Sequence, residues 1–441
     1  MKTMGLDIGT TTVSAAVRDD RAGILTTRTL ENNSFLPGKN WERLQDPAVI
    51  LDISLSLVTQ LLQAHPDIAA IGISTQMHGI LYLDQNGVPC SPLYTWQDGR
   101  GDLPHDDSRS WAAYLSETTG YALATGYGLV THCYNLHHGL VPEEAAVLCT
   151  IGDYLAMVLA GRREPVMDPS NAASLGLYDA VNRRFDSAAL EKAGIDPAML
   201  PKPAIHPCLG CGPLGIPVCT AIGDNQASFL GATSGRTDAL LVNMGTGGQI
   251  SLYTSEAIHI PALELRPFPE GGWLLVGASL CGGRSYALLE QFFRETVKLV
   301  TGQEIMAYDA MARAMETVIP AAEPLTAVTL FQGTRQNPQL RGSIQNIGTR
   351  NFTPQHLISA VMRGMAQELH QMYRDYLALG GTVPCAIIGS GNGLRKNPHL
   401  CRIFSETFGL KLTLSQNEEE AAWGAAIYAA KHGKQKTSGD P

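Results

Sequence analysis

The first residues of the chain alternate in a way that predicts two short strands joined by a glycine turn. Met4-Gly5-Leu6 precedes Asp7-Ile8-Gly9-Thr10-Thr11-Thr12, and residues 13–17 continue the apolar pattern. Glycine between two such runs is typical of strand, tight turn, strand. The turn offers amides and hydroxyls that suit phosphate oxygens, and a carboxylate that suits a hard cation such as Mg²⁺. A plain hairpin is the alternative for this stretch alone.

A helix and a buried strand follow in the first half. Asp46-Pro47 predicts a helix start, because Asp caps helices and Pro fits the first helical position. Apolar residues between 50 and 62 then recur at helical spacing. The apolar run 68–74 predicts a strand that ends in Thr75-Gln76-Met77-His78-Gly79. In an open α/β sheet, ligands bind at the carboxyl ends of strands, so this segment is a candidate site.

The second half repeats these parts in order. Residues 218–222 predict a buried strand that runs into Gly223-Asp224-Asn225. Residues 239–252 then repeat the opening pattern around Gly245-Thr246-Gly247, and a later strand runs into Gly389-Ser390-Gly391-Asn392. We therefore expect two similar domains. If they face each other, both Gly-Thr turns point into a shared cleft suited to a polyphosphate, without the G-x-x-x-x-G-K-[ST] signature.

Two further helices carry start signals in the second half. Thr353-Pro354 predicts the cap of a long amphipathic helix, which Gly380-Gly381 ends. Asn417 is predicted to cap the last helix, where acidic residues fill the first turn and Lys431-His432 lie near the end. That charge order matches the helix dipole.

Length and composition narrow the class of protein. A chain of 441 residues is too long for one ordinary core and predicts two domains. Its 44% hydrophobic and 17% charged residues describe a globular chain rather than a disordered one. The net charge of −9 argues against a nucleic-acid partner. No apolar stretch approaches the ~20 residues that span a bilayer, so no membrane partner is expected.

The nine cysteines favour a reducing compartment. Their count is odd and no signal peptide precedes them, so the cytoplasm is the expected location. Cys208-Leu209-Gly210-Cys211 has C-x-x-C spacing, but no second Cys or His pair follows at zinc spacing. Metal or redox use of this pair is a minor alternative. The Pro- and Gly-rich stretch 201–217 is the best linker candidate.

Five of these motifs, in order, resemble the signature elements of the FGGY carbohydrate kinases, over about residues 4 to 431: Asp7-Ile8-Gly9-Thr10-Thr11, Gln76-Met77-His78-Gly79, Gly223-Asp224-Asn225, Asn243-Met244-Gly245-Thr246 and Gly389-Ser390-Gly391. The resemblance implies an α/β fold of two actin-like (ribonuclease H-like) domains with a cleft between them for ATP and a sugar. We assign a sugar-binding domain to residues 1–222, a nucleotide-binding domain to 223–433, and a disordered tail to 434–441.

Within the family, four stretches look most like the sedoheptulokinases: Tyr94 through Arg100, Ala124 through Gly128, Asp168 through Ser174, and Gly223 through Ser228. This implies ATP-dependent phosphorylation of a ketose at a terminal hydroxyl, from sedoheptulose to sedoheptulose 7-phosphate. A kinase for another sugar or polyol, such as xylulose or ribulose, and a non-catalytic actin-like sugar or nucleotide sensor are the alternatives. A cytoplasmic monomer or homodimer is expected, with a small-molecule sugar substrate.

The resemblance also assigns residues to roles. A kinase must align a hydroxyl with the γ-phosphorus and neutralise charge on the phosphate. Asp224 is the predicted catalytic base, and Asp7 with Asp224 the predicted Mg²⁺ ligands. ATP is expected to contact Thr10, Thr11, Thr12, Gly245, Thr246, Gly247, Gly283, Gly389, Gly391 and Asn392. The glycines are expected there because a side chain would block the approach of the backbone to the nucleotide.

The sugar is expected to contact six residues: Gln76, His78, Trp96, Asp98, Arg100 and Asn225. The segment from Trp96 to Arg100 combines an aromatic face with an amide, a carboxylate and a guanidinium, a mixture that binds sugars. A surface turn with a local Asp–Arg pair is the alternative for this segment, and a buried structural histidine is the alternative for His78.

Overall fold

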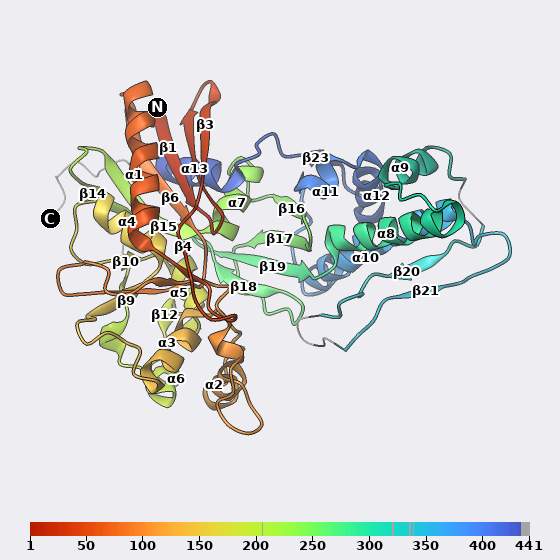
Figure 1. Cartoon of the computed structure of the whole chain (residues 1–441). Helices are drawn as coiled ribbons and strands as arrows, with labels where there is room; N and C mark the ends of the chain where they lie inside the picture. The colour runs from red at the N-terminus through yellow and green to blue at the C-terminus, as the bar shows by residue number, and fades with distance from the viewer. Residues whose placement is uncertain (205, 320–321, 335–336, 338, 434–441) are drawn as a thin grey trace. The chain divides into compact units, whose positions relative to one another are not determined.

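A computed structural model describes residues 1–204, 206–319, 322–334, 337 and 339–433. The chain divides into two compact units (Figure 1). The N-terminal unit contains Met1–Gly235, Arg266–Gly271 and Asn417–Pro441, and the C-terminal unit contains Arg236–Leu265 and Gly272–Gln416. The chain therefore passes between the units more than once.

The N-terminal unit is built on a sheet whose described strands follow the order β14-β15-β6-β1-β2-β3. Strands β1, β2 and β3 form an antiparallel meander, whereas β6 runs parallel to β1 and β15 runs parallel to β6. Their bounds are Lys2–Ile8 (β1), Thr12–Asp19 (β2), Gly23–Glu31 (β3), Ile68–Thr75 (β6), Cys208–Cys211 (β14) and Pro217–Gly223 (β15).

The C-terminal unit repeats five strands of this topology, since β19-β17-β16-β22-β23 corresponds to β3-β2-β1-β6-β15. In the described part of the chain, its main sheet has the order β18-β19-β17-β16-β22-β23. Strands β16, β17 and β19 are antiparallel neighbours, and β22 and β23 run parallel to β16. The predicted internal repeat and the two ribonuclease H-like domains are confirmed. The bounds are Ala239–Met244 (β16), Gly248–Thr254 (β17), Glu264–Pro267 (β18), Trp273–Ser279 (β19), Ala386–Ser390 (β22) and Leu412–Leu414 (β23).

Some of the helices flank these sheets and others lie away from them (Figure 1). In the N-terminal unit the helices are α1 (Pro47–Ala64), α2 (Trp111–Thr119), α3 (Gly128–His137), α4 (Ile151–Leu159), α5 (Pro169–Leu175), α6 (Ser187–Ala193), α7 (Asp224–Ala232) and α13 (Glu420–His432). In the C-terminal unit they are α8 (Gly282–Thr301), α9 (Tyr308–Glu316), α10 (Pro354–Ala378), α11 (Asn392–Arg395) and α12 (Pro398–Phe408). Single turns of 3₁₀ helix span Gly99–Asp102 and Pro197–Met199.

Short strands complete the described secondary structure. Those of the N-terminal unit are β4 (Phe35–Leu36), β5 (Leu44–Gln45), β7 (Leu81–Leu83), β8 (Leu93–Tyr94), β9 (Val147–Cys149), β10 (Val166–Met167), β11 (Tyr178–Asp179), β12 (Arg184–Phe185) and β13 (Lys202–Pro203). Strands β20 (Thr326–Val328) and β21 (Ser343–Gln345) pair with each other in the C-terminal unit.

Two of the predicted helix caps are confirmed and one is wrong. Asp46 accepts a hydrogen bond from the Ala48 amide at the start of α1, and Thr353 caps α10 with Pro in its first turn. The last helix, however, begins only at Glu420, with Glu419 at its N-cap position. Asn417 therefore lies two residues before the N-cap position of α13.

Helix α1 bears on the expectation that no apolar stretch approaches the length that spans a bilayer. Among the described helices it alone has the length and composition that could cross a membrane, with a mean hydropathy of 1.4 over 18 residues. Its Ile50, Leu57 and Leu61 side chains are 1–2% exposed and belong to the core around the N-terminal sheet. An amphipathic core helix explains the same composition.

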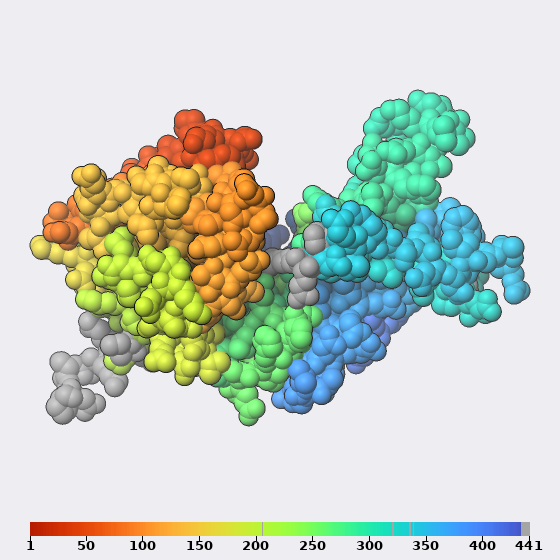
Figure 2. All heavy atoms as spheres, turned by 90° about the horizontal axis from the view of Figure 1, so that it is seen from below, coloured from red at the N-terminus to blue at the C-terminus, as the bar shows by residue number. Residues whose placement is uncertain are grey.

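The N-terminal unit contains a second hydrophobic core beside that of the sheet. It is formed by residues between Ile80 and Ile195, which the chain inserts between β6 and β15, and it is rich in aromatic side chains such as Tyr82, Trp111 and Tyr134. Residues from about 100 to 200, orange to yellow-green, form much of one face of this unit (Figure 2). Segments of this insertion carry several candidate site residues.

The last helix belongs to the N-terminal unit. A Cβ at Gly5 of β1 would lie 1.9 Å from the Ala422 oxygen, and one at Gly72 of β6 would lie 2.0 Å from the Ala425 oxygen. The side chain of Thr3 donates to the Ala426 oxygen at 2.9 Å, and Figure 1 shows α13, in blue, beside the red β1. Only glycine allows backbones to approach so closely.

The observed units differ from the predicted boundaries for this reason. Helix α7 begins at Asp224 but packs within the N-terminal unit, and so does α13, although both fall in the predicted domain 223–433. The division observed at 235/236 and 416/417 follows the packing of these two helices. The predicted tail 434–441 lies outside the described residues.

Candidate active site

The carboxyl ends of three parallel strands bring the predicted catalytic residues to one edge of the N-terminal sheet. Across β1 and β6, Asp7 is the register partner of Ser74, and across β15 and β6, Gly223 is the partner of Thr75. Asp224 follows immediately as the first residue of α7. The edge where ligands bind in such sheets therefore carries both predicted acidic residues.

Burial raises the pKa of both carboxyl groups. Burial raises the pKa of Asp7 from 3.8 to about 7, with a further contribution from the charge of Asp224, against the hydrogen bond that Ser74 donates at 2.7 Å. Burial likewise raises the pKa of Asp224, against the hydrogen bond from Asn225 at 2.9 Å and the charge of Arg266. For both carboxyls, therefore, the hydrogen bonds and nearby positive charge do not offset the cost of burying the negative charge.

This donor set fits a divalent cation that is shared with phosphate groups. Among the described residues, no group of three or more His, Cys, Asp or Glu side chains could hold a metal ion. Magnesium is commonly held by one or two carboxylates together with water and substrate phosphates, so a complete protein cage is not required. Asp7 and Asp224 would supply the carboxylates for such a site.

A closed set of hydrogen bonds joins three predicted site residues from separate segments. The indole N–H of Trp96 donates to the Thr10 hydroxyl at 2.9 Å, and that hydroxyl donates to the Gln76 side chain at 3.2 Å. The amide group of Gln76 donates to the Gln45 side chain at 3.1 Å, and Gln45 donates back to the Thr10 carbonyl at 2.9 Å. Trp96, which donates into this hydrogen-bonded ring, is 46% exposed, so its aromatic face is accessible beside the ring.

The ring changes the expectation for Thr10. Its hydroxyl contacts two residues predicted to bind the sugar, which associates it with that group rather than with the phosphates alone. Thr11 is exposed and Thr12 is half-buried in the same turn. Gln45, at the end of β5, was not predicted as a site residue; its only sequence signal is a polar position just before a helix cap.

His78 is anchored with an unusual backbone conformation. Its φ is +73°, its backbone N–H donates to the Ser174 hydroxyl at 3.0 Å, and its Nδ1 lies 2.6 Å from the Ser174 carbonyl oxygen. The imidazole stacks on Tyr127 with ring centroids 4.6 Å apart. The side chain is half-buried, so it is held in place without being fully enclosed.

Asp98 and Arg100 lie inside the N-terminal unit and bind each other. Their side chains are 0% and 1% exposed, and Arg100 Nε donates to Asp98 Oδ1 at 2.6 Å. The guanidinium also lies over the Tyr94 ring at 4.3 Å, and Asp98 accepts the Arg43 amide N–H at 3.0 Å. This placement does not favour direct contact with a sugar. It favours a role in holding the turn that presents Trp96.

In the C-terminal unit, the predicted glycine segments come together. The Gly283 and Arg284 amides at the start of α8 donate to the Gly245 and Thr246 carbonyls at 2.9 and 3.0 Å. The loop after β22 approaches the same turn, because a Cβ at Gly391 would lie 2.6 Å from the Met244 oxygen. The turn, the helix start and the loop therefore form one structure, with Thr246 and Asn392 exposed.

Packing within the C-terminal unit gives a second reason for the glycines, besides the predicted approach of the nucleotide. Added Cβ atoms at Gly247 and Gly283 would lie 2.8 and 2.4 Å from backbone oxygens of the same unit, and Gly389 packs against the Leu412 and Leu394 side chains. Close packing of the protein with itself already requires glycine at these positions. Gly245 differs, since its nearest neighbour would be 3.9 Å away, and it is exposed.

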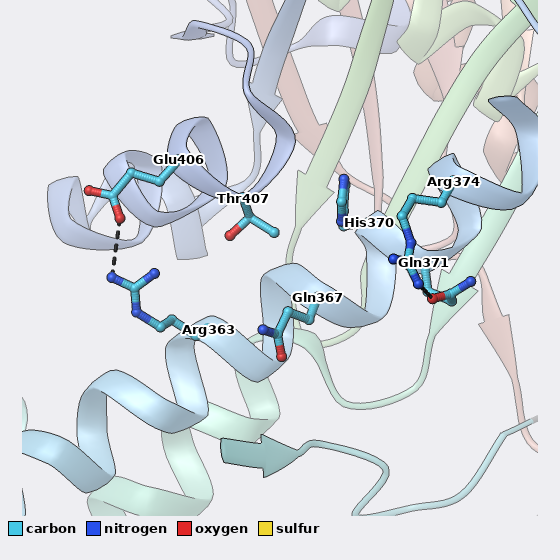
Figure 3. Close-up of a pocket in the computed structure, with 7 residues that line it drawn as sticks. All are labelled: Arg363, Gln367, His370, Gln371, Arg374, Glu406 and Thr407. Carbon is cyan, nitrogen blue, oxygen red and sulfur yellow. Dashed lines mark hydrogen bonds and ion pairs between the residues drawn. The ribbon is translucent and has the colours of Figure 1, made fainter. Parts of the chain in front are cut away.

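Two other features do not coincide with the predicted site. A cavity of about 540 Å³ between α10 and α12 is lined by residues of both charge signs, including the Arg363–Glu406 ion pair at 3.2 Å (Figure 3). None of its lining residues is a predicted site residue. Cys208 and Cys211 lie on strand β14 opposite Cys219 and Pro217 of β15, and among the described residues they belong to no group of three or more side chains that could hold a metal ion.

The duplicated sheet topology, with carboxylates at the strand ends of one unit and packed glycine turns in the other, fits a two-domain α/β phosphotransferase of the actin-like fold. Residues 2–231 match the FGGY family of carbohydrate kinases, N-terminal domain, and residues 240–432 match the C-terminal domain of that family. The chain therefore belongs to the FGGY family of carbohydrate kinases and is a carbohydrate kinase.

Individual relatives extend this finding. The chain is 29% identical to a sedoheptulokinase of Mus musculus over 96% of each chain. Among solved structures, it is similar to a xylulose kinase of Rhodospirillum rubrum with a TM-score of 0.83 and 22% identity, covering 99% of this chain and 91% of the other. A glycerol kinase of Plasmodium falciparum, solved with ADP, has a TM-score of 0.79 and 18% identity over 98% and 89%.

Proposed function

We propose that the protein transfers the γ-phosphoryl group of ATP to a terminal hydroxyl of a ketose, and that this ketose is sedoheptulose, which yields sedoheptulose 7-phosphate. The observation that carries the proposal is the Asp7–Asp224 pair at the ends of β1 and β15. Burial raises the pKa of both carboxyls, and perturbed carboxyls of this kind are typical of groups that bind a cation or accept a proton. Similarity to the mouse sedoheptulokinase over nearly the full length favours sedoheptulose over xylulose or ribulose.

Asp224 is the base in this proposal. The sugar oxygen forms a bond to the γ-phosphorus while the bond from that phosphorus to the β–γ bridging oxygen breaks, and ADP leaves. The proton of the sugar hydroxyl passes to the Asp224 carboxylate. Asp7, with help from Asp224, would hold Mg²⁺, which supplies the neutralisation of phosphate charge that such transfers need.

The remaining predicted residues divide between sugar and nucleotide. On the sugar side we propose contacts from Gln76, His78, Trp96 and Asn225, with Asp98 and Arg100 holding the turn that presents Trp96. On the nucleotide side we propose the glycine-rich structure of the C-terminal unit, together with the hydroxyls of the first turn: Thr10, Thr11, Thr12, Gly245, Thr246, Gly247, Gly283, Gly389, Gly391 and Asn392.

Cysteine chemistry supports a proposal for the compartment. All nine cysteines are free thiols in the structure. Free thiols persist in reducing compartments, which supports the cytoplasm as the proposed location. A monomer or homodimer stays a prediction.

A coupled assay of ADP release tests the proposal. Purified protein with ATP and Mg²⁺ is screened against ketoses and polyols of five to seven carbons. ADP release with sedoheptulose well above that with xylulose or ribulose supports sedoheptulose as the substrate. The reverse order would mean that the substrate is a five-carbon sugar. If no sugar gives release although sugars raise the melting temperature, the protein is a sensor rather than a kinase.

Asp224→Asn tests the catalytic base. The amide keeps the shape of the carboxyl but cannot accept the proton, so turnover should fall by about 10²–10⁴-fold while sugar affinity changes little. Asp107→Asn, at an exposed position outside the site, is the matched control and should keep wild-type turnover. Turnover of Asp224→Asn within a few-fold of the wild type would remove Asp224 from this role.

A further inference from the structure

Helix α5 contacts both the strand that leads to the proposed base and the histidine proposed to contact the sugar. The helix is short, beginning after the Asp168 cap with Pro169 at its first position and ending at Gly176. Ser170, Asn171 and Ser174 are 0–4% exposed. Buried polar side chains are costly unless they are hydrogen-bonded, so their partners show what they do.

Two of these side chains hold the end of β15. The Ser170 hydroxyl donates to Asp168 Oδ1 at 2.6 Å and accepts the Gly223 amide N–H at 3.1 Å. Asn171 Nδ2 donates to the Ala221 carbonyl oxygen at 3.0 Å. Gly223 directly precedes Asp224, so these bonds fix the backbone from which the proposed base projects.

The third side chain holds His78. The Ser174 hydroxyl donates to the Asn171 carbonyl at 2.7 Å and accepts the His78 backbone N–H at 3.0 Å. The Ser174 carbonyl oxygen lies 2.6 Å from His78 Nδ1. A carbonyl oxygen can only accept, so Nδ1 must carry the proton, and in the neutral ring Nε2 is then the acceptor nitrogen.

We propose that α5 is a positioning element of the kinase, in which Ser170 orients Asp224 through Gly223 and Ser174 orients His78 as a hydrogen-bond acceptor for a sugar hydroxyl. The inference rests on the proposed function for its kinetic meaning. It goes beyond that function by giving separate tasks to two serines that touch neither the proposed base nor the sugar. One rigid helical turn sets the spacing between the base and the sugar contact.

The two serines should affect different kinetic constants. Ser170→Ala leaves the Gly223 N–H without its buried acceptor, so kcat should fall by about 5- to 100-fold with the sugar KM within about twofold. Ser174→Ala frees the backbone of His78, so the sugar KM should rise by about 5- to 100-fold with kcat within about twofold. Steady-state kinetics with the best substrate of the screen measure both.

Ser54→Ala is the matched control. Ser54 is also fully buried in the N-terminal unit and donates at 2.7 Å, but only to Ile50 within its own helix α1. Its removal should lower the melting temperature and leave kcat and KM unchanged. If Ser170→Ala and Ser174→Ala behave in the same way as this control, the serines only stabilise the fold and the proposal is wrong.

A measurement on the unmodified protein separates this proposal from the kinase assignment. Nitrogen-15 NMR of histidine-labelled protein distinguishes the two imidazole tautomers, and His78→Gln assigns the His78 signal among the 12 histidines. The Nδ1–H tautomer is expected near pH 8. A predominant Nε2–H tautomer would overturn the role of Ser174 even if the protein is a kinase, whereas absence of ADP release would overturn only the proposed function.

Discussion

Replacement of Asp7 by Asn should make the metal-free protein more stable at alkaline pH while abolishing its activity. In the folded protein, burial and the nearby Asp224 raise the pKa of Asp7 from 3.8 to about 7. The folded state therefore binds a proton that the unfolded state has lost. The stability contributed by this group is complete below pH 3.8, declines as pH rises from 3.8 to 7, and is lost above pH 7. Asparagine is neutral throughout, so the variant avoids this loss.

The size of the effect follows from the displacement of the pKa. A pKa difference of one corresponds to about 1.4 kcal/mol, so a rise from 3.8 to about 7 corresponds to roughly 4 kcal/mol at most. Asp7 is partly exposed, and solvent screening should reduce this to about 1–3 kcal/mol. The hydrogen bond from Ser74 survives, because the amide oxygen of Asn accepts it as well.

Urea unfolding at pH 4 and pH 8 without divalent cations measures the difference. Tryptophan fluorescence reports mainly on the N-terminal unit, which contains Asp7, because four of the five tryptophans belong to it: Trp41, Trp96, Trp111 and Trp423. At pH 4 the variant and the wild type should unfold at similar urea concentrations. At pH 8 the variant should be more stable by about 1–3 kcal/mol, or about 2–4 °C in melting temperature for each kcal/mol.

Magnesium supplies the second half of the test. At pH 8 the wild type should gain stability from Mg²⁺ with ADP, since a bound ligand stabilises the folded state, and the variant should gain much less. A variant that is no more stable than the wild type at pH 8 would refute the reasoning about the buried charge. A full response of the variant to Mg²⁺ would refute the role of Asp7 as a metal ligand.

Two further substitutions test the sugar side and the nucleotide side. Trp96→Phe keeps the aromatic face but removes the N–H that donates to Thr10, so the sugar KM should rise about 3- to 10-fold with kcat within twofold; an unchanged KM in steady-state assays would remove this hydrogen bond from sugar binding. At Gly391 φ is +83° and an added Cβ would lie 2.6 Å from a backbone oxygen, so Gly391→Ala should lower the free energy of unfolding by about 2–4 kcal/mol and raise the KM for ATP. At Gly380 φ is +85° but an added Cβ would have no neighbour within 4 Å among the described residues, so Gly380→Ala should lower the free energy of unfolding by only about 1–2 kcal/mol and leave that KM unchanged.

The sequence predicted local structure and order of parts well because both depend on neighbouring residues. The glycine turn after Asp7, its repeat after Asn243, and the caps at Asp46 and Thr353 rest on alternation, turn chemistry and capping. The repeated order of parts was enough to predict two domains of one topology. The sheet order in each unit confirms that prediction.

Long-range packing could not be predicted in the same way. The return of α13 to the N-terminal unit depends on contacts between β1 and residues more than 400 positions later. Glycines at positions 5 and 72 and the alanines of α13 were available as a signal, but small residues have many other uses. The predicted boundary at 222/223 missed this packing for that reason.

Side-chain burial was the other limit on the prediction of the site. The segment from Trp96 to Arg100 has a composition that suits either a sugar contact or a local ion pair. In the structure Trp96 is exposed, whereas Asp98 and Arg100 form an enclosed ion pair. Ser170 and Ser174 were part of a stretch noted for its resemblance, yet their tasks depend on distant partners, Gly223 and His78.

The packing of α13 has a consequence for the order in which the protein folds during synthesis. A ribosome makes the sheet of the N-terminal unit first, but the helix that fills the space beside Gly5 and Gly72 emerges only after the whole of the C-terminal unit. Until then, the apolar surface of β1 and β6 is exposed, and such surfaces attract aggregation. The C-terminal unit can therefore complete its core before the N-terminal unit does, even though it is synthesised later.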